Sequence, residues 1–502
     1  MEALRTRSAN EADFEFIEES LTLREASASH EIAKKRQGKK TKPPWRRRML
    51  VCERSTIHPI SLTIMKIYKT LITITICFVV PTSLWAEIPE STTQKKVRVY
   101  ILAGQSNMEE KAGFQPLAWQ VGQEKFKDRY THLIVDGDHA AFSKAYQASI
   151  AKDPKNPVYK FSERRDVWMS NHGRHGNLSA DYLKTNNKFG LEINFGHEMG
   201  NQYDEQVLII KTAWGGRSIH RGYRPPSAIP SEEQIKSEWN TIVSEQKAKR
   251  EKDLANYPMK LEAFKKKLAD YQKAKATGSL KKNQRAPNKP KDPTTQSSRG
   301  PKNLAEYRES YGSDYRNMIK EVKAALADIK TNHPAYQDQG YEIKGFVWFQ
   351  GYNDMFAEEA RNNYAKNLVK LIKDLKKELN APNTKTVIGQ MGHHGDLKGL
   401  YQETKDKSTG KMKMSGNGAI RKAQLKASQH ADIKNSTALV RTAPFWDMEA
   451  DAIFTGPGSW QKDIAKWQQF GADRPYHYYG SPWFFSQAGK AFGKAMIQLE
   501  SN

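Results

Sequence analysis

Four short polar segments contain the residue types that could together cleave an ester. They hold Ser106 in GQSNM, Gly215 and Gly216 in AWGGRS, Asn353 in GYND and His477 in PYHYYGS. A serine can attack a carbonyl carbon, a histidine can take its proton, and backbone or amide N–H groups can stabilise the oxyanion that forms. Each segment alone also fits a plain turn, a helix N-cap or a surface histidine. The order of all four in one chain indicates acyl transfer.

The segment Val97–Met108 positions the candidate nucleophile. Its apolar run Val97–Leu102 is typical of a buried central strand, and Gly104 then permits a turn into Gln105 and Ser106. Open α/β sheets bind ligands at the carboxyl ends of their strands. A backbone N–H at the start of a following helix is also suited to an anion. We therefore expect Ser106 at the carboxyl edge of a parallel sheet.

From residue 87 onward, apolar strand patterns alternate with helical patterns, which favours a parallel sheet covered on both faces. Three of the expected strands end in turns rich in glycine and polar residues, so the candidate site should lie at one edge. The expected strands are Val97–Ala103, Val207–Ala213, Ile343–Phe349, Thr386–Gln390 and Ala438–Arg441. The expected helices include Ile193–Tyr203, Ala357–Leu379 and Ser486–Leu499.

A Lys-rich insertion at about 232–303 interrupts this alternation. Apolar residues at three- and four-residue spacing from Leu254 to Tyr271 predict a helix, which Pro258 should kink or divide. Thr277–Lys302 is poor in apolar residues and predicts a flexible loop, and Leu304–Ile329 predicts a further helix. The simplest expectation is a solvated helical hairpin; anchoring to an anionic polysaccharide is the alternative.

The formal net charge of +25 raises nucleic acid as a partner. Much of this charge lies in the N-terminal run Lys34–Arg48 and in the insertion, and neither interleaves aromatic residues as a nucleic-acid-binding fold would. We expect no specific nucleic-acid binding.

The N-terminus has the layout of a secretory signal. Residues 65–86 contain a short basic region, the apolar stretch Thr70–Val80 and a tail of small residues, whereas residues 1–64 are highly charged. We expect 1–64 to be a non-native or disordered extension, translation to begin at Met65, and the mature protein to be secreted or periplasmic without a stable membrane span. The alternative is a real membrane anchor with a cytoplasmic tail. Both cysteines, Cys52 and Cys77, precede the expected cleavage point, so the mature chain would hold no disulfide and no Cys-ligated metal.

The four segments resemble the conserved blocks of the SGNH hydrolase superfamily. The phrases ILAGQSNM and VWFQGYNDM are similar to its branch of carbohydrate acetylesterases, which includes sialate O-acetylesterases and acetylxylan esterases. The resemblance spans about Val97 to Met496 outside the insertion. It implies that residues 87–502 form an α/β domain, a three-layer α/β/α sandwich with a flavodoxin-like parallel sheet. It also implies a Ser106–His477–Asp473 triad with an oxyanion hole formed by the Ser106 and glycine N–H groups and the Asn353 side chain.

Two positions depart from the pattern of that branch. Tyr352 stands where many members carry an acidic residue after the glycine, although the GxND form is kept. Asp473 and His477 are separated by three residues, whereas Asp-x-x-His has two. The alternatives for the acid are Asp463, Asp451 and Asp447, or a Ser-His pair without an acid.

The function that the resemblance implies is removal of O-acetyl groups from sugars or polysaccharides through an acyl-enzyme, with no cofactor and no metal. Gln105, Gln350, Arg217 and Tyr352 are candidates for substrate binding. The tryptophans Trp214, Trp348 and Trp483 fit either a sugar cleft or the core. His393 and His394 invite a metal site, but neighbouring residues at a strand end point to opposite faces, which favours a pocket or structural role.

Two other classes of function remain open at this point. One is a noncatalytic carbohydrate-binding protein on the same fold, and the other is a membrane-tethered scaffold built on the basic insertion.

Overall fold

The computed structural model describes residues 88–153, 161–180, 188–281, 284–295, 300–397, 399–405, 410, 412–457 and 460–502. The expected N-terminal extension, the signal peptide and both cysteines lie outside these residues and stay predictions. Among the helices of the described ranges, none combines the length and the apolar character that a membrane crossing needs.

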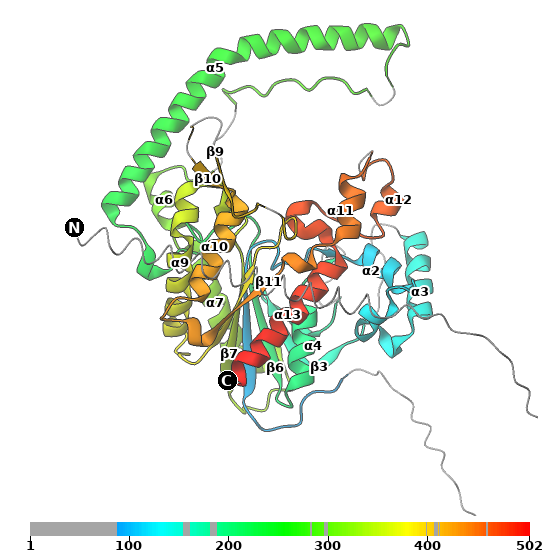
Figure 1. Ribbon diagram of the computed structural model, residues 1–502, viewed down its shortest axis with the longest axis vertical. Coiled ribbons are helices and arrows are strands. Elements are labelled where there is room, and N and C mark those ends of the chain that lie inside the picture. Colours follow the sequence, from blue (N-terminus) through cyan, green and yellow to red (C-terminus); the bar gives the residue numbers. More distant parts are fainter. Residues whose placement is uncertain are drawn as a thin grey trace, which may run out of the picture. The chain divides into compact units, whose positions relative to one another are not determined.

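A seven-stranded sheet forms the centre of the domain, in the order β11-β8-β7-β1-β6-β3-β4 (Figure 1). Every neighbouring pair is parallel except β3 and β4. The bounds are Val97–Gly104 for β1, Arg164–Asn171 for β3, Arg174–Leu178 for β4, Val207–Ala213 for β6, Tyr341–Phe349 for β7, Lys385–Gln390 for β8 and Thr437–Arg441 for β11. The five expected strands are thereby confirmed. Strand β3 was not expected because it begins with the charged residues Arg164, Arg165 and Asp166.

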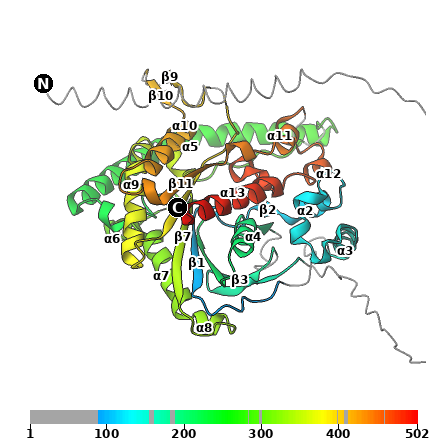
Figure 2. The same ribbon diagram turned by 60° about the horizontal axis from the view of Figure 1, so that its bottom comes forward.

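Helices cover both faces of the sheet, which confirms the three-layer α/β/α architecture (Figure 2). Side chains of β1 alternate between the two cores: Tyr100 and Leu102 pack on one face, Val99 and Ile101 on the other. The first face is covered by α4 (Glu192–Gln202) and α13 (Pro482–Glu500). The second is covered by α7 (Ser313–Ala327), α9 (Glu358–Glu378) and α10 (Gly416–Ser428).

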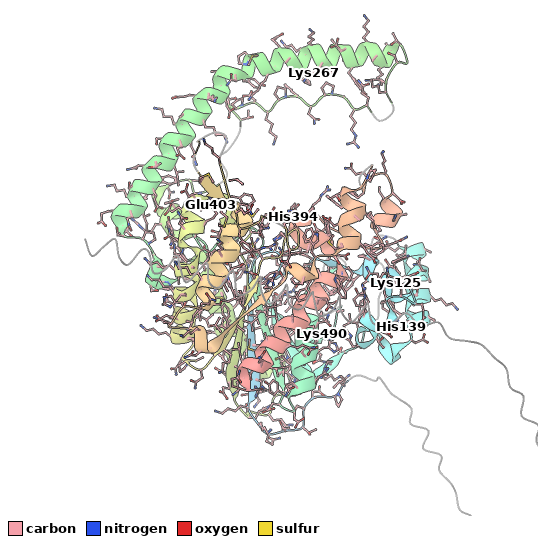
Figure 3. The ribbon with its side chains drawn as sticks, in the orientation of Figure 1. Lys125, His139, Lys267, His394, Glu403 and Lys490 are labelled. Atoms are coloured by element: carbon pink, nitrogen blue, oxygen red, sulfur yellow. The ribbon has the colours of Figure 1, made fainter. Side chains whose placement is uncertain are left out.

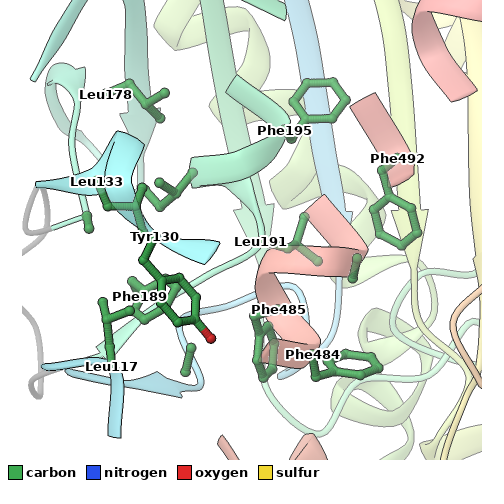
Figure 4. Close-up of a cluster of buried hydrophobic side chains, with 14 of the residues drawn as sticks. Leu117, Tyr130, Leu133, Leu178, Phe189, Leu191, Phe195, Phe484, Phe485 and Phe492 are labelled. Carbon is green, nitrogen blue, oxygen red and sulfur yellow. The ribbon is translucent and has the colours of Figure 1, made fainter. Parts of the chain in front are cut away.

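The first core is rich in aromatic side chains (Figure 4). Phe484, Phe485 and Phe492 of α13 lie in the same cluster as Phe195 of α4 and Phe189. Burying each such side chain contributes roughly 1.5–3 kcal/mol relative to leaving it exposed. The cluster extends to α2 (Phe114–Val121) and α3 (His139–Lys152), beyond the edge of the sheet.

The insertion begins with one long helix, α5 (Glu232–Ala276, 45 residues). A capping box between Ser231 and Gln234 starts it. It extends away from the domain, with Lys267 on its outer part (Figure 3). Pro258 does not divide α5, so that part of the expectation is wrong: a proline removes one hydrogen bond, and the turns on either side keep theirs.

The described residues of Thr277–Lys302 return beside α5 and form no helix, as expected of this loop (Figure 1). Pro287, Pro290 and Pro293 are each at least half-buried, a spacing that matches the three residues per turn of a polyproline helix. The expected second helix, Leu304–Ile329, is not continuous. It consists of α6 (Leu304–Ser310) and α7, which are separated by Gly312 at φ +70°.

Short elements complete the domain. They are β2 (Ala112–Gly113) paired with β5 (Lys188–Phe189), β9 (Glu403–Lys405) paired with β10 (Met412–Met414), and the helices α8 (Ile329–Asn332), α11 (Met448–Thr455) and α12 (Ile464–Trp467).

Candidate active site

The three strands that carry the polar turns are neighbours, in the order β7-β1-β6. Gly104, at the end of β1, is in register with Ala213 of β6 and with Phe349 of β7. A Cβ atom at position 104 would lie 2.2 Å from the Phe349 carbonyl oxygen, so only glycine fits there. The loops after these strands therefore meet at the carboxyl edge of the sheet, as expected.

Ser106, both glycines and Asn353 come together at this edge. Ser106 is buried at 8% exposure, and a Cβ built on Gly215 would lie 3.7 Å from the Ser106 Cβ. The Asn353 side-chain amide donates a hydrogen bond to the Gly216 carbonyl oxygen at 2.6 Å. The positive φ of Gly216 (+73°) shapes this contact, since few other residues adopt that conformation. Three of the four segments thus form one site.

The fourth segment brings His477 and Asp473 side by side. The His477 Nδ1 lies 3.1 Å from the Asp473 Oδ1, within ion-pair distance. The two groups are not aligned well enough to count as a hydrogen bond. The other carboxylate oxygen of Asp473 accepts a hydrogen bond from Lys188 Nζ at 2.6 Å. Burial alone would raise the pKa of Asp473, but His477, Lys188 and the Arg474 N–H hold it well below its ordinary value.

A tight loop compensates for the extra residue between Asp473 and His477. The N–H groups of Ala472 and Asp473 both donate to the Tyr479 carbonyl oxygen, at 2.7 and 2.9 Å. Tyr478 and Tyr479 have φ of +49° and +63°, an uncommon conformation for residues other than glycine. The Tyr478 ring stacks on Phe484 with centroids 3.5 Å apart, which anchors the loop to α13.

Hydrogen bonds join this loop to the nucleophile loop. The Asn107 side chain donates to the Tyr476 carbonyl oxygen at 3.1 Å, and His393 Nε2 lies 3.0 Å from the same oxygen. Burial lowers the pKa of His393 to about 3, so its ring is neutral and donates from Nε2. The residue after Ser106 and the residue before His477 are thus connected directly.

The alternative acids are engaged elsewhere. Asp447 accepts from Ser481 and from two N–H groups at the start of α11, Asp451 from the Tyr479 hydroxyl, and Asp463 from the Lys466 N–H of α12.

A buried amide network lies beneath the site. Gln105 Oε1 accepts from Gln350 Nε2 at 3.2 Å and from the Gly351 N–H at 3.1 Å. Gln350 also donates to Asp354 at 2.6 Å, and Asp354 accepts from the His220 N–H at 2.9 Å. Burial raises the pKa of Asp354 to about 6 against the effect of these donors. The network holds the loops after β1, β6 and β7 at fixed positions.

Glu109 occupies one of the expected oxyanion donors. Its Oε1 accepts a hydrogen bond from the Gly215 N–H at 2.7 Å, and its Oε2 lies 2.9 Å from Lys111 Nζ. A carboxylate oxygen therefore takes the Gly215 N–H, one of the donors expected for the oxyanion.

Other expected contact residues take different positions. Arg217 is exposed, with Nε 3.6 Å from Asp314, and Tyr352 is half-buried with its ring 4.9 Å from that of His393. Trp348 is fully buried and donates to the Tyr364 hydroxyl, so it belongs to the core. Trp214 packs beside the His172 ring, whereas Trp483 carries the Arg129 guanidinium over its ring.

The histidine pair separates as its position at a strand end predicts. His393 is buried, whereas His394 is exposed, with its ring near Trp446 (Figure 3). In the described part of the chain, no three His, Cys, Asp or Glu side chains converge to hold a metal ion.

Four residues of the site were not identified from sequence: Asn107, Glu109, Lys188 and Asp354. Asn107 and Asp354 lie inside the phrases GQSNM and GYND, and their position beside Ser106 and Asn353 was a usable signal. Lys188 carried no signal, because it lies 285 residues before Asp473.

Solved structures with similar chains share little sequence with this one. A protein from Arabidopsis thaliana is 13% identical, with a TM-score of 0.36, covering 80% of this chain and 98% of its own. NanS is 9% identical, with a TM-score of 0.38, covering 82% of this chain and 99% of its own. XAC1771, described as a novel carbohydrate acetylesterase from Xanthomonas citri, is 11% identical, with a TM-score of 0.32. The match covers 70% of this chain and 50% of the XAC1771 chain. No curated protein matches significantly.

The family model described as "Carbohydrate esterase, sialic acid-specific acetylesterase" matches residues 96–268 and 287–442, more than half of the chain. The match includes Ser106, Gly215, Gly216 and Asn353 and ends before Asp473 and His477. The chain belongs to this family of carbohydrate esterases.

Proposed function

We propose that the protein removes O-acetyl groups from acetylated sugars or polysaccharides by a serine acyl-enzyme mechanism. The observation that carries this proposal is the connection between two loops. The Asp473–His477 pair lies in a loop whose Tyr476 carbonyl oxygen is hydrogen-bonded to Asn107, the residue after Ser106. Family membership supports the substrate class.

In the first step, the Ser106 hydroxyl oxygen attacks the ester carbonyl carbon while His477 takes the hydroxyl proton. The sugar alcohol leaves with a proton from His477, and Ser106 keeps the acetyl group. Water then attacks the acetyl carbon while His477 accepts its proton, and His477 returns that proton to the Ser106 oxygen as acetic acid leaves and ionises to acetate. Serine, histidine and aspartate divide these tasks in many unrelated hydrolases.

Asp473 stabilises the imidazolium that His477 becomes. Its pKa lies well below the ordinary value, so it stays ionised throughout the neutral range. Lys188 fixes the orientation of the carboxylate by binding the second oxygen. The pair thereby favours the ring tautomer that carries the proton on Nδ1 and leaves Nε2 available to Ser106.

Donors from two loops would stabilise the oxyanion. The Ser106 N–H and the Asn353 amide come from the loops after β1 and β7. The Gly215 N–H joins them only when Glu109 leaves it, because each N–H makes one good hydrogen bond.

Hydrolysis of p-nitrophenyl acetate and of acetylated xylan by residues 87–502 tests the proposal, with Ser106→Ala and His477→Ala beside the wild type. We expect both variants to lose at least about 10³-fold in kcat. Activity that survives Ser106→Ala would show that another nucleophile acts. Chromatographic detection of free acetate would identify the bond cleaved.

A noncatalytic carbohydrate-binding protein is the second candidate, since Glu109 occupies the Gly215 N–H. A folded wild type that hydrolyses neither ester but binds xylan, with equal affinity in Ser106→Ala, would support it.

We also propose that the mature protein is secreted or periplasmic, and that it begins after residues 65–86. The basic, apolar and small-residue order of that segment supports this location. Mass spectrometry of the N-terminus of the protein expressed from the full gene tests it: a mature start near residue 87 is expected, and an intact Met1 would contradict it.

A further inference from the structure

A polar cavity adjoins the candidate active site beyond Glu109. It has a volume of about 240 Å³ and lies between the loop after β1, the β3–β4 turn and the end of β6. Ala213, at the end of β6, is the first residue of the segment AWGGRS that contains Gly215. Pockets for drug-sized ligands measure about 300–1,000 Å³, so this cavity suits one small unit.

The lining of the cavity offers hydrogen-bond donors and acceptors in close alternation. Carboxylates come from Glu109 and Glu110, and cations from Lys111, Arg174 and Lys211. Most of these charges are compensated: Lys111 pairs with Glu109 at 2.9 Å, and Lys211 pairs with Glu110 at 2.6 Å. A cavity of this kind carries many directed polar groups but little net charge, which matches a neutral, hydroxyl-rich ligand.

Asn171 provides an independent sign that a ligand belongs there. It lines the cavity at 3% exposure, and its Nδ2 donates to Glu110 at 3.1 Å. Its Oδ1 is buried and receives no hydrogen bond from any described residue. An unpaired buried acceptor costs about 1–3 kcal/mol, and a hydroxyl donor from a ligand would satisfy it.

We propose that this cavity is the subsite that binds the hydroxyl groups of the sugar unit whose acetyl ester Ser106 attacks. The inference rests on the proposed function. Asn171 accepts a sugar hydroxyl, and Arg174, at the mouth of the cavity, donates to another. Glu109 leaves the Gly215 N–H and accepts a hydroxyl in the cavity, so that binding of the sugar opens the oxyanion hole.

The test compares each variant on an acetylated sugar and on an ester without a sugar. The sugar substrates are acetylated xylo-oligosaccharides and a 9-O-acetylated sialic acid, and the reference is p-nitrophenyl acetate. For Asn171→Ala and Arg174→Ala, the ratio of kcat/KM on the better sugar to kcat/KM on the reference should fall roughly tenfold. Arg165→Ala is the control, because Arg165 lies at the opposite end of β3 with its side chain 41% exposed.

The outcomes separate this inference from the proposed function. A ratio that stays within twofold in both variants would overturn the subsite, as would a wild type that cleaves p-nitrophenyl acetate but neither sugar. A wild type that cleaves no ester at all would instead refute the proposed function. Arg174→Lys should have a higher ratio than Arg174→Ala, since lysine keeps a hydrogen-bond donor. The circular dichroism spectra of all variants should match that of the wild type.

Discussion

The Asn107 side chain donates a hydrogen bond to the Tyr476 carbonyl oxygen at 3.1 Å. This bond ties the residue that follows Ser106 to the residue that precedes His477, although 369 positions separate the partners in sequence. Because attack requires the serine oxygen and the imidazole nitrogen at a fixed separation, the bond sets the geometry of the proposed reaction.

Asn107→Ala should lower kcat by roughly 10- to 100-fold, because a shift of about 1 Å between reacting groups has effects of this size. Loss of the hydrogen bond should lower the free energy of unfolding by only about 1 kcal/mol. Steady-state kinetics with p-nitrophenyl acetate and urea denaturation measure the two effects. Asn363→Ala is the matched control, since Asn363 is partly exposed on α9 and its side chain donates to the Glu359 carbonyl oxygen one turn earlier. Equal kcat in Asn107→Ala and the wild type would contradict this role.

Asp473→Asn should lower kcat by about 10²-fold or more, because an amide supports neither the required tautomer nor the imidazolium. Asp463→Asn should change kcat less than twofold, since Asp463 only caps the short helix α12. Kinetics of the two variants side by side distinguish Asp473 from the alternative acids. A larger loss in Asp447→Asn or Asp451→Asn, with native thermal stability, would reassign the acid.

Lys188→Met should destabilise the protein by about 0.5–1 kcal/mol at pH 7, the range of partly exposed ion pairs. Lys188 contributes to the lowered pKa of Asp473, and a carboxyl with a lowered folded pKa stabilises the fold above its unfolded pKa. The difference between variant and wild type should therefore shrink as the pH falls below about 4. Urea titrations at pH 7 and at several values below pH 4 measure it. Lys330→Met removes an exposed ion pair and serves as the control. A difference that grows on acidification would contradict the assignment.

The sequence predicted the structure well where one segment contains both a strand and the site residue that follows it. Strands β1, β6 and β7 were predictable because apolar runs lead directly into glycine-containing turns, and these turns hold Ser106, Gly215 and Asn353. The contacts of Lys188 and Glu109 were not predictable, because each depends on how distant or adjacent loops approach one another in space.

The insertion shows a different limit of sequence patterns. The 3–4 spacing from Leu254 to Tyr271 correctly indicated a helix, but a helical seam does not identify its partner. An extended segment with Pro287, Pro290 and Pro293 runs back beside it, and no helix is possible with prolines at that spacing.

His393→Gln should make the free energy of unfolding less dependent on pH between about 3 and 6.5. Burial lowers the folded pKa of His393 to about 3, so the unfolded chain binds this proton more readily throughout that range. Stability should thus fall on acidification by about 1.4 kcal/mol per pH unit for this one proton, and glutamine removes that contribution. Chemical denaturation at pH 4.5, 5.5 and 6.5 measures the slope for each protein. Equal slopes would mean that the His393 ring is protonated or exposed in the folded state.

Lys211→Met should destabilise the protein by about 3–5 kcal/mol, the usual effect of removing one partner from a buried ion pair. Lys211 is 1% exposed, and its Nζ lies 2.6 Å from Glu110 and 2.8 Å from Glu192. Although burial alone would lower the pKa of Lys211, the two carboxylates raise it, so the lysine is charged in the folded protein. Methionine would leave the buried carboxylate of Glu192 without Lys211, while Glu110 would keep its interaction with Arg174.

The double variant Lys211→Met/Glu192→Gln provides the matched comparison, because it also removes the more deeply buried of the two negative charges. It should recover part of the lost stability, since the remaining carboxylate of Glu110 keeps the Asn171 amide as a donor. Thermal and urea denaturation of both variants and of Lys320→Met, which removes an exposed lysine nearby, measure the effect. A double variant less stable than Lys211→Met alone would contradict this account, because glutamine removes the charge of Glu192 but keeps an oxygen that can accept from the Gly190 N–H.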